Sequence, residues 1–159
     1  MPAITSYDQL IKIIQDRLSL ALKNTQYEIY KVIHENVEKY YQENVFFEKS
    51  ATPSVYERTY QFLNSVIKTD VVMNGNSVSC SVKINPDELS YIQSGQTVID
   101  MINRGYHADT SLNGGKYNAI GDIHAKGHFW DDSIEELGGY NGILEIMKKN
   151  CKKVGLNVI

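Results

Sequence analysis

Apolar residues in the first third of the chain recur at helical spacing, with polar side chains between them. Ser6 followed by Gln9 forms a capping-box pattern, which predicts that a helix begins near Tyr7. We therefore predict a long amphipathic helix over residues 7–47. Its apolar positions are Leu10, Ile14, Leu18, Leu22, Ile29, Ile33, Val37 and Tyr40. Its polar faces carry Lys12, Gln15, Asp16, Lys23, Glu28, Lys31, Glu35 and Glu38.

This helix would be long for its chain. Neither proline nor glycine occurs between residues 3 and 52. At 1.5 Å per residue an unbroken helix would be roughly 50–60 Å long. A compact domain of this size has a diameter of about 35–40 Å. Either the helix breaks near Asn24-Thr25, or it projects and packs against a partner such as a second copy.

The next segments predict a second helix and a β-hairpin. Pro53 suits the first turn of a helix over residues 53–67. Asn74-Gly75 predicts the tight turn of a hairpin over residues 70–84. In the return strand, apolar and polar residues alternate: Val78, Cys80, Val82 and Ile84 against Ser77, Ser79, Ser81 and Lys83. This alternation predicts an antiparallel sheet with one covered face, and the long helix is the expected cover.

The last third combines a glycine-rich segment with a helix. A short helix is predicted over 97–103, and a long loop over 105–127, where glycine recurs. Loops of this length in small domains are usually functional or become ordered on assembly. A helix is predicted over 140–153 with Gly155 as its cap, and residues 156–159 are a candidate final strand. The elements together predict an α+β fold in a single domain, residues 1–159. Its long N-terminal helix and shorter helices pack on one face of a small antiparallel β-sheet, with a long Gly-rich loop.

Composition narrows the functional classes. A net charge of −3 and a pI near 5.8 argue against a dedicated nucleic-acid binder, which normally carries a basic face. No signal peptide and no membrane-spanning apolar run are visible, so we expect a protein kept in a cytoplasm, without membrane contact. Cys80 and Cys151 are then expected to be reduced thiols. Eleven tyrosines favour contact surfaces, because tyrosine buries area at low entropic cost.

One segment gathers candidate metal ligands. GDIHAKGHFWDD and the residues before it hold His107, Asp109, Asp122, His124, His128, Asp131 and Asp132. Imidazole and carboxylate groups suit zinc, iron or nickel. Gly127 lies between the last two histidines and argues against their presentation on a helix. No nucleophile arrangement is visible either. We expect a polar loop with no metal, no cofactor and no catalysis; the alternative is a metal-binding hydrolase or regulator whose ligands are His124, His128 and Asp122.

A short motif after the long helix resembles a phage family. It reads Tyr56-x-Arg58-Thr59-x₃-Leu63-x-Ser65. It is similar to a segment of the small neck and tail-completion (head–tail joining) proteins of tailed bacteriophages of the Firmicute-phage type. In that family a long N-terminal helix precedes the segment, a β-hairpin follows it, and an H-x-F segment leads into a C-terminal helix. That segment would be His128-Phe129-Trp130, so the order of elements matches across most of the chain. Tyr60 stands where the family often has glycine.

The resemblance implies a structural virion protein and no catalysis. It implies a homo-oligomeric ring, usually a hexamer, at the neck or the head-proximal end of the tail. The ring would join the head connector or adaptor to the tail-tube proteins and leave a channel for DNA, which passes without specific binding. The virion would assemble in the host bacterial cytoplasm. The expected interface residues are Arg58, Thr59, Tyr106, His107, Leu112, Tyr117, Ile120, Ile123, Phe129 and Trp130.

Several points stay open at the level of sequence. They are the ring size, the connector-facing or tube-facing position, the phage of origin, and the order of the 105–127 loop before assembly. Another possibility is a bacterial helical adaptor that dimerises through residues 7–47.

Overall fold

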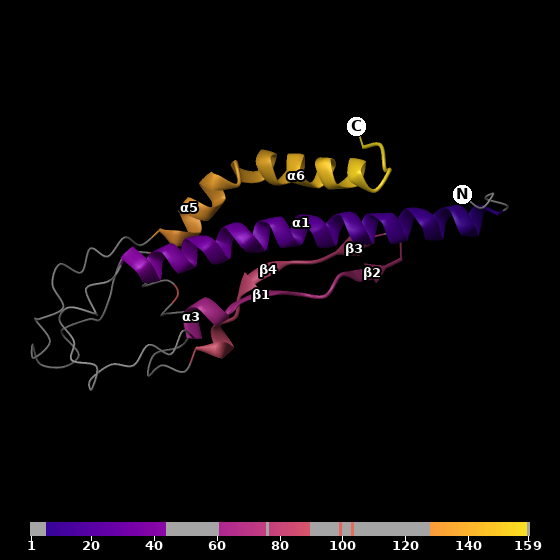
Figure 1. Cartoon of the computed structure of the whole chain (residues 1–159). Coiled ribbons are helices and arrows are strands. Elements are labelled where there is room, and N and C mark those ends of the chain that lie inside the picture. The colour runs from indigo at the N-terminus through magenta and orange to yellow at the C-terminus, as the bar shows by residue number, and fades with distance from the viewer. Residues whose placement is uncertain are drawn as a thin grey trace, which may run out of the picture. The chain divides into compact units, whose positions relative to one another are not determined.

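The structure is a computed structural model that describes residues 6–43, 61–75, 77–89, 99, 103 and 128–158, with the backbone alone for 40–43. The elements are α1 (Tyr7–Glu43), α3 (Gln61–Asn64), β1 (Val66–Lys68), β2 (Val72–Asn74), β3 (Ser77–Ser79), β4 (Val82–Ile84), the 3₁₀ helix η1 (Pro86–Glu88), α5 (Phe129–Glu136) and α6 (Gly139–Lys153) (Figure 1). The fold is α+β, which confirms the predicted class.

The chain divides into two compact units. Unit 1 comprises Met1–Lys31, Lys68–Lys83 and Leu137–Ile159. Unit 2 comprises Val32–Ile67 and Ile84–Glu136. The helix α1 contributes residues to both units, and each unit has buried residues of its own. The single domain over residues 1–159 stays a prediction.

The helix α1 is continuous for 37 residues, or about 55 Å, and does not break at Asn24-Thr25. The Oγ atom of Ser6 accepts a hydrogen bond of 3.3 Å from the backbone N–H of Gln9, so the predicted cap is confirmed. Thr25 is accommodated within the helix, where its buried hydroxyl is satisfied by donating to the carbonyl of Ala21 at 2.9 Å. Residues 44–47 of the predicted helix lie outside the described residues.

The second helix ends earlier than predicted. Of the range 53–67 the structure describes residues from 61 onward, and α3 ends at Asn64. The backbone N–H of Ser65 donates to Gln61 at 2.8 Å, and its hydroxyl donates to the carbonyl of Phe62 at 2.6 Å. Val66 then begins β1. The predicted boundary at residue 67 was wrong, because the β-branched pair Val66-Ile67 lies in a strand instead.

The hairpin consists of two short ladders, β1 with β4 and β2 with β3. In the second ladder, Asn74 pairs with Ser77 in antiparallel register. The turn therefore begins at Gly75, one position later than the predicted Asn74-Gly75. The reason is that Gly75 takes the first turn position, which needs positive φ, and its φ is +57°.

A β-bulge separates the two ladders. The backbone N–H of Thr69 donates to Ser81 at 2.9 Å, whereas Val72 pairs with Ser79. Two residues, Asp70 and Val71, therefore lie opposite Cys80 alone, which is the two-against-one count of a bulge.

The helix α1 covers one face of the hairpin in unit 1, as predicted. The apolar members of the return strand, Val78, Cys80, Val82 and Ile84, are half-buried, and Ser77, Ser79, Ser81 and Lys83 are exposed. The Nε2 atom of Gln26 donates to the carbonyls of Thr69 at 2.7 Å and Ser81 at 2.8 Å, at the bulge. Gln15 donates to the carbonyl of Gly75 at 3.4 Å. These amides fix the hairpin on the helix through backbone groups.

The C-terminal helix α6 lies along α1 in unit 1 (Figure 1). It ends at Lys153, and Gly155, whose φ is +78°, caps it as predicted. The backbone N–H of Leu156 donates to Cys151 at 2.9 Å and that of Gly155 to Lys152 at 3.0 Å, which is the Schellman pattern. Residues 156–158 form no strand, so the described part of the predicted strand over 156–159 is absent.

In unit 2, Phe62 and Phe129 form the aromatic centre of the core. Their ring centroids are 5.0 Å apart at an interplanar angle of 79°, an edge-to-face arrangement. Asn103 caps α5 from a distant segment. Its Oδ1 atom accepts a hydrogen bond from the backbone N–H of Trp130 at 3.1 Å. Its backbone carbonyl accepts one from the backbone N–H of His128 at 2.7 Å. This capping orients the start of α5.

Candidate partner-binding surface

Most of the sequence-predicted interface residues lie outside the described residues. They are Arg58, Thr59, Tyr106, His107, Leu112, Tyr117, Ile120 and Ile123. The loop 105–127 and two of the alternative metal ligands, Asp122 and His124, lie outside as well. Their roles stay predictions.

The described members of the predicted site are in or beside α5. Phe129 is 2% exposed and packs in the core of unit 2. Trp130 is half-buried and reaches the surface. The Nδ1 atom of His128 lies 3.4 Å from a carboxylate oxygen of Asp131. In the part of the chain that the structure describes, no three metal-ligating side chains gather.

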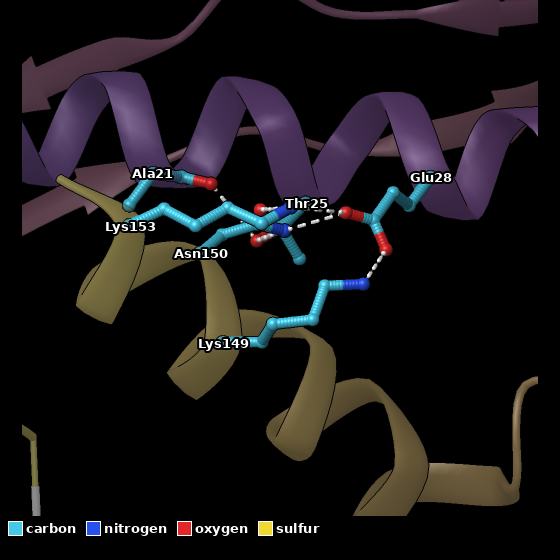
Figure 2. A network of polar contacts seen from close by, with 6 residues as sticks. All are labelled: Ala21, Thr25, Glu28, Lys149, Asn150 and Lys153. Carbon is cyan, nitrogen blue, oxygen red and sulfur yellow. Dashed lines mark hydrogen bonds and ion pairs between the residues drawn. The ribbon is translucent and has the colours of Figure 1, made fainter.

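The interface between α1 and α6 is held by a polar network (Figure 2). Asn150 is fully buried, and its Nδ2 atom donates to Thr25 at 3.3 Å and to Glu28 at 3.1 Å. Lys149 donates to the other carboxylate oxygen of Glu28 at 2.7 Å. Lys153 donates to Asn150 at 3.2 Å and lies 3.7 Å from Glu28. Buried polar groups that are mutually satisfied select one register of two helices, so this network sets where α6 lies on α1.

The network changes the titration of Glu28. The hydrogen bond from Lys149 holds the pKa of Glu28 below its ordinary value of 4.5. Partial burial acts in the opposite direction, while the hydrogen bond from Asn150 and the charges of Lys149 and Lys153 add to the lowering. The ionised carboxylate is therefore the form that the folded state favours.

This lowered pKa predicts acid sensitivity of the α1–α6 interface. A carboxyl whose pKa is lower when folded contributes stability above its unfolded value and loses it as the pH falls through the folded value. The stability from Glu28 should be present above pH 4.5 and disappear below it. Urea unfolding of the wild type and of Glu28→Gln across this range measures the effect. The difference between the two proteins should shrink on acidification.

The control for this experiment is Glu145→Gln. The side chain of Glu145 is 71% exposed and pairs along its own helix, with Lys148 at 3.2 Å. Exposed pairs of this kind contribute little, so this variant should follow the wild type across the range. Equal pH profiles for Glu28→Gln and Glu145→Gln would contradict the assigned role of Glu28.

The first turns of α1 expose apolar side chains. Tyr7, Leu10 and Ile14 are 74%, 38% and 44% exposed. They continue the side of α1 on which α6 lies, because Ile14, Ala21 and Thr25 follow one another at helical spacing. The chain after α6 turns near Arg17, whose guanidinium donates to the carbonyl of Gly155 at 3.2 Å. We call Tyr7, Leu10 and Ile14 the end patch; clustered exposed apolar residues are typical of protein contact sites.

Sequence reasoning missed the α1–α6 network and the exposure of the end patch. Glu28 had been assigned to a solvated face, and Leu10 and Ile14 to the covered one. The signal for the network was Thr25, a polar residue that continues the row of Ile14 and Ala21 at helical spacing. The expected free thiols are present: Cys80 and Cys151 are unpaired with each other, and burial raises the pKa of both.

Comparison with known protein families shows to which family the chain belongs. The model of the YomN family matches residues 6–153, which is nearly the whole chain. The chain belongs to the YomN family. YomN is a phage-derived family of prophage type, so this is a phage-associated protein. The YomN match includes all of α1 and all of α6, the two helices that form the polar interface.

Neither the search of curated proteins nor the search of solved structures gave a match to this YomN-family chain. Among the described residues, no helix has the length and apolar content needed to cross a membrane.

Proposed function

We propose that this protein is a structural component of a tailed-phage virion, forming a ring at the neck that joins the head connector to the tail tube. The observation that carries the proposal is the exposed apolar surface of α1, including the end patch, in a chain of a phage-derived family. Such a surface on a long helix suits a protein whose partners are other proteins. The motif and element order that resemble neck and tail-completion proteins support the same role.

The proposed role is mechanical and not catalytic. The ring matches the geometry of connector and tail and leaves a channel through which DNA passes. No observation in the described residues favours the metal-dependent alternative, of whose ligands only His128 is described.

The test is a nonsense mutation of the gene in the phage, followed by electron microscopy of the lysate. We expect DNA-filled heads and complete tails that stay unjoined, and mass spectrometry should detect the protein in purified wild-type virions. A plasmid copy of the wild-type gene should restore joined particles. Joined, infectious particles without the protein would refute the proposal, as would its absence from virions.

The end patch is tested in the same complementation assay. The double variant Leu10→Asp, Ile14→Asp should fail to restore joining, because charges replace the apolar contact surface. The matched control is Asp8→Asn, which changes an exposed polar residue in the same turns and should restore joining. Circular dichroism of each purified variant separates loss of contact from loss of folding. Equal rescue by both variants would remove the end patch from the interface.

A further inference from the structure

The helix α1 carries a third face, distinct from the sides that hold the hairpin and α6. Asp16, Leu20, Lys23 and Tyr27 follow at intervals of four, three and four residues and so share one side of the helix. Leu20 is 50% and Tyr27 is 58% exposed. Apolar residues thus lie on all three sides of α1, and a helix that is apolar all round is normally buried. We call these residues, with Lys12 and Lys68, the third face.

The third face carries three lysines, Lys12, Lys23 and Lys68, against the single acid Asp16, so it is basic although the chain has a net charge of −3. Lys12 and Lys23 are exposed on it. The ammonium group of Lys68 lies 5.0 Å from the ring centroid of Tyr27 and 4.4 Å from that of Tyr30, which holds a positive charge beside the aromatic surface. A partner that fits this face carries negative charge around a small apolar centre.

The helix α5 has the complementary chemistry. Phe129 and Ser133 are buried in unit 2, and Trp130 and Ile134 are half-buried. The remaining positions of this eight-residue helix are exposed acids: Asp131, Asp132, Glu135 and Glu136. An acidic stripe therefore lies beside a partly exposed tryptophan and isoleucine.

We propose that the third face of α1 binds α5 of a second copy of this chain. In this contact Lys23 and Lys68 meet Asp132 and Glu135, while Leu20 and Tyr27 meet Trp130 and Ile134. Opposite potentials on two surfaces steer association and select the partner. The inference rests on the proposed function and names its subunit interface.

We assign a second copy as the partner of the third face because the chain itself carries both complementary surfaces, the basic third face and the acidic helix α5. The contact joins different surfaces of two identical chains, so it is head-to-tail and leaves each chain with one free surface of each kind. Repetition of such a contact closes a ring when the rotation permits. The end patch has no comparable charge pattern and is left for a different partner.

Carbodiimide cross-linking reads this contact directly, because it joins only lysines and carboxylates that touch. Equal amounts of ¹⁵N-labelled and unlabelled full-length protein are mixed, and peptides are identified by mass spectrometry. We expect mixed-isotope cross-links from Lys23 or Lys68 to Asp132 or Glu135. The pair Lys149–Glu28, at 2.7 Å within one chain, is an internal control that should give same-isotope links. Absence of the mixed links while the control links form would overturn the proposal.

Charge reversal gives a second, independent test. The double variants Lys23→Glu, Lys68→Glu and Asp132→Lys, Glu135→Lys should each weaken self-association about tenfold or more in sedimentation velocity. An equal mixture of the two should associate again. The acidic third face of the first variant then meets the basic α5 of the second, and the basic third face of the second meets the acidic α5 of the first. The control pair Lys83→Glu, Lys152→Glu changes exposed lysines outside the third face and should leave association unchanged. Failure of the mixture to associate, with folded chains, would overturn the pairing.

The two proposals fail in different ways. If the third-face variants restore head–tail joining in the phage, the interface is wrong and the neck role stands. If the mixed cross-links form but virions lack the protein, the contact is real and the neck role is wrong. A wild type that stays monomeric at all concentrations and gives no mixed links refutes the interface alone.

Discussion

Replacing Phe62 with alanine is expected to lower the free energy of unfolding by about 4 kcal/mol. Phe62 is 1% exposed and packs edge-to-face on Phe129 at 5.0 Å, so truncation removes buried area and an aromatic pair and leaves a cavity. Urea unfolding measures the loss. The fluorescence of Trp130, the single tryptophan of the chain, reports on α5 beside the altered site.

Two matched variants serve as controls for the loss of buried volume at Phe62. Phe62→Leu keeps most of the volume and should cost about 1–1.5 kcal/mol. Leu20→Ala removes an apolar side chain that is 50% exposed and should change stability by about 0.5 kcal/mol or less. The three variants should therefore rank by the buried volume that each removes. Equal effects of Phe62→Ala and Leu20→Ala would mean that Phe62 is not a core residue of unit 2.

Gly142→Ala is the second change with a large expected effect. Gly142 lies in the first turn of α6, and a Cβ atom there would collide with the backbone carbonyl of Leu137. Backbone atoms cannot rotate aside as a flexible side chain can, so the turn between α5 and α6 has to shift. We expect a loss of about 3 kcal/mol in the free energy of unfolding. Urea unfolding followed by circular dichroism measures it, and hydrogen exchange locates the loss in α6.

The control is Gly139→Ala, three residues earlier in the same turn. Gly139 has a φ of +64°, but a Cβ atom there meets nothing within 4 Å. Alanine at this position bears only the cost of a left-handed backbone, about 1 kcal/mol. If Gly139→Ala proved as damaging as Gly142→Ala, backbone conformation and not close approach would explain the need for glycine in this turn.

Elements with strong local periodicity could be predicted from the sequence. The alternation from Ser77 to Ile84 predicted which side chains α1 covers, because side chains of a strand point to opposite faces regardless of context. The ends of elements were less predictable. The second helix ends at Asn64 and the hairpin turn begins at Gly75, since pairing between strands decided both.

The candidate surface was only partly predictable. Trp130 was expected at an interface and does reach the surface, but Leu10 and Ile14 were expected to be covered. Their spacing is that of a core stripe, and spacing shows which residues share a side without showing what lies against it. The third face combines side chains of α1 with Lys68 from the hairpin, which no local pattern links to Tyr27.

By itself, the sequence determined the α+β class, the helical periodicity of most of α1 and the covered face of the hairpin. These follow from short-range periodicity and from residue order. Only the tertiary structure decided that Gln26 holds the bulge and that Thr25 and Glu28 both accept hydrogen bonds from the buried Asn150 of α6. Each of these polar side chains finds its partner in space and not along the chain, because a buried hydrogen-bonding group must be satisfied by whatever group the fold places beside it.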